Sequence, residues 1–84
     1  MKKNKDAENI VEYVTHPHLE IIGNSECVID GLKGITEYTK DKIKINLGKY
    51  SVTFFGDELY INSFSREGAT VEGTIISLEY EGNA

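Results

Sequence analysis

The sequence predicts one all-β domain, a small antiparallel β-sandwich of seven or eight short strands with a short N-terminal helix. Apolar and polar residues alternate from His18 to Tyr80, as in strands with one buried and one wet face. Turns rich in glycine recur at a spacing of roughly eight to ten residues, which is typical of sandwiches and barrels. The 84 residues suffice for one domain. We therefore divide the chain into a flexible basic tip with a short helix (1–17) and a β domain (18–82).

The N-terminal helix is predicted over residues 7–15. Asp6 is a suitable N-cap, and apolar residues follow it at helical spacing. His16 precedes Pro17, and a residue before proline avoids the helical region, so the helix should end there. The apolar residues of its face are Ile10, Val11 and Val14.

The strands follow one another between turns. The alternation is clearest where Ile43 and Ile45 point inward and lysines point outward, as in a sheet with one face in water. Gly56-Asp57 is a strong hairpin signal, and Gly73 inside an alternating segment indicates a bulge or sharp bend. The alternating segments are 19–22, 26–30, 35–38, 42–47, 50–55, 58–62, 70–72 and 74–81.

The charge is distributed unevenly and bears on the choice of partner. The chain has a net charge of −5, with a cluster of Lys2, Lys3 and Lys5 near its start. From Asp6 onward, 14 acidic and six basic residues give a net charge of −8, which argues against nucleic acid. The lysine cluster is either a solvated tip or a contact to an anionic lipid surface or an acidic partner.

The single cysteine and the lack of long apolar runs predict a cytoplasmic protein. Cys27 is the only cysteine, which argues against a secreted disulfide scaffold and for a reducing compartment. The basic start is not followed by an apolar signal-peptide core, and no run is long enough to span a membrane. Cys27 alternates with Ile29, so we expect it to pack as a small hydrophobe, with a redox role as the alternative.

No catalytic constellation is recognisable, so we expect neither enzymatic activity nor a cofactor. The two histidines lie together at the start of the domain, and the sequence contains neither a Gly-x-Ser-x-Gly elbow nor a phosphate loop. His16 and His18 would point the same way in an extended chain, with Glu20 on that side, which is a weak metal pattern. The alternative is that the two rings flank Pro17 and cap the helix end.

Aromatic residues form the candidate interaction surface. Phe54 and Phe55 are adjacent, so they must face opposite sides of a strand, and one of them can be exposed. Exposed phenylalanine among tyrosines is typical of interface anchors, although cross-strand packing explains the same residues. The candidate anchors are Tyr38, Tyr50, Phe55 and Tyr60.

About three-quarters of the chain resembles the YabP/YqfC family of sporulation proteins, more closely the YqfC branch. The segments that carry the resemblance are Ile22-Gly23-Asn24, Asp30-Gly31-Leu32-Lys33-Gly34-Ile35, Glu37-Tyr38-Thr39, Ile43-Lys44-Ile45-Asn46, Gly56-Asp57-Glu58-Leu59-Tyr60-Ile61, and Val71-Glu72-Gly73 followed by Ile75. The Leu47-Gly48-Lys49 turn is shorter than that branch leads one to expect. The resemblance implies a small cytoplasmic protein of endospore-forming bacteria that acts in the mother cell, and it brings no catalytic residues.

Together these observations predict a non-enzymatic sporulation protein that works by surface contacts. Strand edges and the aromatic residues would bind further copies of the chain, another sporulation protein or a membrane-associated component. The alternative is a small ligand- or metal-binding regulatory module that uses His16, His18 and Glu20.

Overall fold

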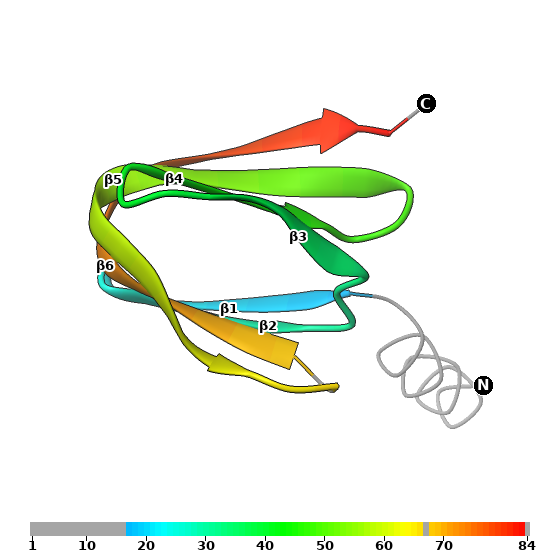
Figure 1. The fold of residues 1–84 in the computed structure, drawn as a ribbon, viewed down its shortest axis with the longest axis horizontal. Coiled ribbons are helices and arrows are strands. Elements are labelled where there is room, and N and C mark those ends of the chain that lie inside the picture. The colour runs from blue at the N-terminus through cyan, green and yellow to red at the C-terminus, as the bar shows by residue number, and fades with distance from the viewer. Residues whose placement is uncertain (1–16, 67, 84) are drawn as a thin grey trace, which may run out of the picture.

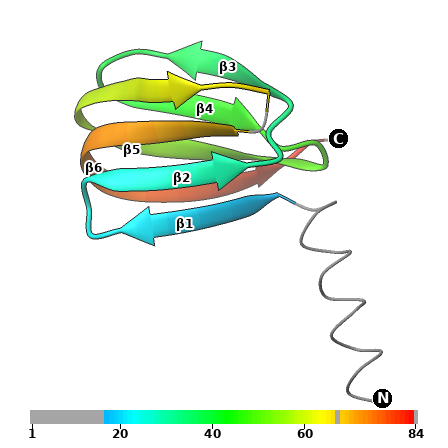
Figure 2. The same cartoon turned by 90° about the horizontal axis from the view of Figure 1, so that it is seen from below.

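The computed structural model describes residues 17–66 and 68–83, and these residues form six antiparallel strands in one open sheet. The spatial order is β1-β2-β6-β5-β4-β3 (Figures 1 and 2). The strands are β1 (His18–Ile22), β2 (Glu26–Asp30), β3 (Gly34–Tyr38), β4 (Lys42–Asn46), β5 (Tyr50–Phe64) and β6 (Gly68–Gly82).

The all-β prediction is confirmed, whereas the predicted sandwich of seven or eight strands is not. The segments predicted as 50–55 and 58–62 are one strand, β5, and the segments predicted as 70–72 and 74–81 are one strand, β6. Gly56-Asp57 is therefore a bulged bend inside β5, and the predicted hairpin at this position is wrong. The predicted helix of residues 7–15 and the tip before it lie outside the described residues.

Glycines allow the two long strands to bend beside each other. A Cβ atom at Gly56 would overlap the Thr74 carbonyl oxygen, so only glycine permits the strands this close approach. Gly73 has a φ of +122°, and Glu58 across from it has a φ of +51°. The β5–β6 register shifts between Phe55 and Gly56 and again before Tyr60, because bulges add residues to one strand only.

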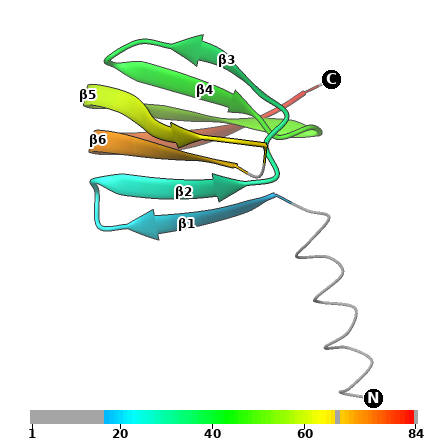
Figure 3. The ribbon, with the colours of Figure 1, turned by 60° about the horizontal axis from the view of Figure 1, so that its bottom comes forward.

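The bend brings the two halves of the sheet face to face (Figure 1). β1 and β2 continue the half that contains the start of β6, and β3 and β4 continue the half that contains the start of β5. The β1–β2 and β3–β4 hairpins thus lie at opposite borders of the sheet (Figure 3).

The core lies between the two halves. Ile43 pairs with Phe54 and Ile45 with Val52, so their side chains share the inner face, as the alternation predicted. On the other half, Cys27 pairs with Val71. The buried apolar cluster consists of Cys27, Ile29, Ile43, Ile45, Leu47, Val52, Phe54, Leu59 and Val71. Burial of these side chains is the main stabilising contribution to the fold.

Candidate interaction surface

Two of the four predicted anchors, Tyr38 and Tyr60, are exposed near one border of the sheet. Tyr38 ends β3 and is 53% exposed, and its hydroxyl oxygen accepts a hydrogen bond from the Ile61 N–H at 2.9 Å. Tyr60, next to Ile61 in β5, is 46% exposed. The contact brings β3 and the second half of β5 together, so the structure places these two tyrosines close to each other.

The Tyr60 hydroxyl is held on the outer face of the sheet by Glu72. It donates a hydrogen bond to Glu72 Oε1 at 2.8 Å, and Asn62 Nδ2 donates to Glu72 Oε2 at 2.9 Å. The hydrogen bond to this carboxylate, together with its charge, raises the pKa of the Tyr60 phenol. These bonds join the exposed Tyr60 ring to Glu72 on the neighbouring strand.

Tyr50 and Phe55 lie elsewhere. Tyr50, at the start of β5, packs against the core and meets Tyr80 edge-to-face, with ring centroids 5.7 Å apart. Phe55 is half-buried on the outer face of β5, with Lys42 Nζ 5.8 Å from its ring centroid. Phe54 is fully buried, so the expectation that the two phenylalanines face opposite sides is confirmed. The four predicted anchors therefore do not form one continuous patch.

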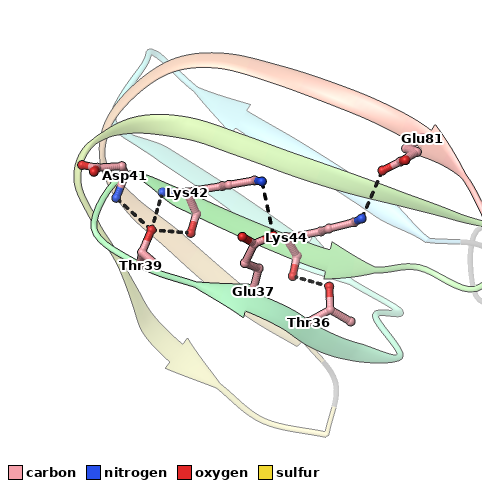
Figure 4. A network of polar contacts seen from close by, with 7 residues as sticks. All are labelled: Thr36, Glu37, Thr39, Asp41, Lys42, Lys44 and Glu81. Atoms are coloured by element: carbon pink, nitrogen blue, oxygen red, sulfur yellow. Dashed lines mark hydrogen bonds and ion pairs between the residues drawn. The ribbon is translucent and has the colours of Figure 1, made fainter.

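The outer face of β3 and β4 carries a polar network that extends to Glu81 in β6 (Figure 4). Lys42 pairs with Glu37 at 3.4 Å, and Lys44 Nζ lies 3.1 Å from Glu81 Oε1, across β5. Thr39 organises the β3–β4 turn, since its Oγ1 accepts a hydrogen bond from the Lys42 N–H at 3.0 Å. Alternating charges thus cover this half of the sheet.

Sequence reasoning missed which strand edges are covered and which are open. The Lys40 carbonyl accepts a hydrogen bond from the Leu59 N–H at 2.8 Å, and Tyr38 binds Ile61 two residues further along β5. On the other side, the Asn24 carbonyl accepts from the Ile75 N–H at 2.8 Å. Beyond Ile75, the C-terminal half of β6 runs along the outside of the molecule with β5 as its neighbour (Figure 1). Alternation along one strand contains no information about these contacts between distant segments.

Cys27 is buried, as predicted. Its side chain has no exposed surface, and burial raises the pKa of the thiol to about 11. A neutral, buried thiol is a poor nucleophile and a poor metal ligand.

The predicted metal pattern finds no support among the residues that the structure covers. Of the proposed ligands, His18 and Glu20 lie in β1, whereas His16 precedes the described part of the chain. Within residues 17–66 and 68–83, no three histidine, cysteine or acidic side chains are placed to hold a metal ion. The same residues contain no helix long and apolar enough to cross a membrane.

Comparison with known protein families identifies the family of this chain. The family model described as the YabP family matches residues 14–84, which is most of the chain and includes all six strands. Neither the curated proteins nor the solved structures provide a match.

Proposed function

Because this chain belongs to the YabP family, we propose that it is a non-enzymatic sporulation protein that acts through protein–protein contacts in the mother-cell cytoplasm of an endospore-forming bacterium. The family match and the resemblance in motif order support the role in sporulation. We further propose that it belongs to the YqfC-like branch, on the resemblance of its motifs in their order and spacing. The described residues form a thin, bent sheet whose free edges and exposed tyrosines are suited to contacts.

The observation that carries the proposal is that the described sheet has both an open strand edge and several exposed tyrosines. The C-terminal half of β6 has a strand on one side only, and Tyr38, Tyr60 and Tyr80 each expose about half of their surface. Strand edges supply main-chain donors and acceptors to a partner, and tyrosine supplies apolar contact area at low entropic cost. Partners suited to such a surface are another sporulation protein, a membrane-associated component or a second copy.

The role in sporulation is tested in the native host. We expect that deleting the gene lowers the count of heat-resistant spores and that the wild-type chain, expressed in the mother cell, restores it. Expression confined to the forespore should not restore it. An unchanged spore count after deletion would contradict the role, and rescue from the forespore alone would contradict the assigned compartment.

The contact mechanism is tested with a surface variant in the same strain. Tyr60→Ala removes an exposed ring whose only described side-chain partner is Glu72, so the fold should tolerate it. Tyr60→Phe is the matched control, because it keeps the ring and removes only the hydroxyl. We expect Tyr60→Ala to lower the spore count and to lose the partner that wild type and Tyr60→Phe retain in cross-linking experiments. Equal spore counts and equal cross-links for all three chains would contradict a role for this surface.

A further inference from the structure

The C-terminal half of β6 is the least protected edge of the described sheet. β2 pairs with β6 only as far as Glu72, whereas β5 pairs with it as far as Gly82. After the bond from the Ile75 N–H to the Asn24 carbonyl, no backbone of another described segment bonds to the free side of Ile76–Gly82. This leaves a row of main-chain groups open to pairing with a further strand.

The other borders are shorter or covered. β1 and β3 have five residues each, and the pairing of β3 is broken by a register shift between Ile35 and Glu37. On the outer side of β5, the N–H groups of Leu59 and Ile61 are covered by the Lys40 carbonyl and the Tyr38 hydroxyl. Short, bulged or covered edges are the usual protection against unwanted pairing, and β6 has this protection only at its bend.

Side chains along the open edge alternate between acidic and apolar character. Glu79 pairs with Thr53 and Glu81 with Ser51, which places both glutamates on the outer face. Leu78 and Tyr80 lie on the opposite, inner face, and Tyr80 is 59% exposed. Ile76, at the bulge where the edge begins, is 67% exposed. A strand that pairs here would meet acidic groups on one face and apolar groups on the other.

The fold already contains one strand that matches this pattern. In β4, Lys42 and Lys44 point to the outer face, and Ile43 and Ile45 point into the core. Lys44 reaches across β5 to Glu81, with 3.1 Å between Nζ and Oε1 (Figure 4). A strand with the same alternation on the free side of β6 would lie directly beside Glu79 and Glu81, with no strand between them.

We propose that the C-terminal half of β6 binds an extended segment of a partner protein in which lysine or arginine alternates with large aliphatic residues. The segment would add a seventh strand, with its basic residues opposite the glutamates and its aliphatic residues beside Leu78 and Tyr80. This inference rests on the proposed function and specifies the edge and the chemistry of the partner.

A second copy of the chain fits this edge less well. The ladder with β5 is regular from Ser77 to Gly82. Two-fold antiparallel pairing of this segment about Glu79 places Glu79 opposite itself, and pairing about Tyr80 places Glu79 opposite Glu81. Like charges directly opposite each other destabilise a sheet, so charge complementarity favours a basic segment.

The test uses the full chain and a synthetic peptide of about eight residues, the length of a common strand, in which lysine alternates with valine. Binding is measured by fluorescence anisotropy of a dye on the peptide. Two control peptides have the same composition: one groups its lysines and valines in blocks, and the other carries N-methyl groups on alternate backbone nitrogens. We expect binding of the alternating peptide and at least about fivefold weaker binding of both controls, since pairing needs the alternation and the main-chain donors.

Two matched variants locate the site. Glu79→Gln removes one charge from the proposed edge, and Glu37→Gln removes one charge from the same face at the far border, where Glu37 pairs with Lys42. We expect Glu79→Gln to weaken peptide binding about three- to fivefold, which is the effect of losing one of the stronger exposed ion pairs. Glu37→Gln should leave peptide binding unchanged.

Any of three results would overturn the assignment of this edge. They are equal binding of the alternating and N-methylated peptides, equal effects of the two variants, and no binding of the alternating peptide to the wild-type chain. A concentration-dependent dimer in sedimentation that Glu79→Gln strengthens would assign the edge to a second copy and would also overturn it. The proposed function fails separately, through an unchanged spore count in the deletion strain.

Discussion

Gly73 combines two features that a single added methyl group would violate, a positive φ and a close approach of the neighbouring backbone. Its φ of +122° is one that residues with a Cβ rarely adopt. A Cβ atom there would also overlap the Glu58 carbonyl and lie 2.9 Å from Leu59 Cα. These are backbone atoms of the neighbouring strand, so the clash cannot be relieved by a rotamer change.

We expect Gly73→Ala to lower the free energy of unfolding by about 2–4 kcal/mol. The strained backbone accounts for about 1–3 kcal/mol, and displacement of the β5 backbone adds to it. For a domain of this size each kcal/mol corresponds to about 4–8 °C in Tm, so Tm should fall by roughly 10–25 °C. Gly82→Ala is the matched control, because a Cβ at Gly82 meets nothing within 4 Å and its φ is not in the positive range.

The measurement is thermal unfolding of both variants followed by far-UV circular dichroism, with urea unfolding as a second probe. The control should stay within about 1 kcal/mol of the wild type, since glycine-to-alanine changes at unstrained sites have effects of about 0.4–1 kcal/mol. If Gly73→Ala unfolds within about 3 °C of Gly82→Ala, the bend does not depend on glycine and the reasoning is refuted.

Three further predictions concern single groups. Tyr38→Phe removes the acceptor of the Ile61 N–H and should cost about 0.5–1.5 kcal/mol in urea unfolding, because that hydrogen bond joins β3 to β5; an unchanged midpoint would contradict this. Burial raises the pKa of the Cys27 thiol from 9.0 to about 11. The contribution of the protonated thiol to the free energy of unfolding is therefore complete below pH 9. It is lost as the pH rises from 9 to 11, because the unfolded chain loses this proton first. The stability of the wild type should therefore fall more steeply in that range than that of Cys27→Ala, and parallel curves would contradict the buried thiol. Zinc, nickel and copper should leave the Tm of the full chain unchanged, whereas a rise that His18→Ala abolishes would support the metal-binding alternative.

The inner and outer faces of the strands were predictable because they depend on neighbours in sequence. Alternation placed Ile43, Ile45 and Phe54 inside, and Phe55 on the opposite face. The turn at Gly23 was also predictable, since glycine there has a φ of +56° in a short connection between strands. These features are local, and the structure confirms them.

The bends were not predictable, because they depend on pairing between distant segments. A glycine-aspartate pair between two alternating segments is equally compatible with a hairpin and with a bulge. The outcome at Gly56 depends on the Thr74 carbonyl that approaches it from the neighbouring strand. The same limit applies to the candidate surface, since the exposure of Tyr38 and Tyr60 depends on how β3 meets the second half of β5.

The strand order has a consequence for how the chain folds. β3, β4 and β5 each pair with the next strand in the sequence, and so does β1 with β2. Among the six described strands, only the β2–β6 pairing joins segments far apart in the chain. Contacts of such separation form late, because loop closure must precede them. Cys27 is buried at that seam, opposite Val71. The accessibility of its thiol therefore reports on this late pairing. In pulsed alkylation during refolding, protection of the Cys27 sulfur should appear when the β1–β2 hairpin pairs with β6.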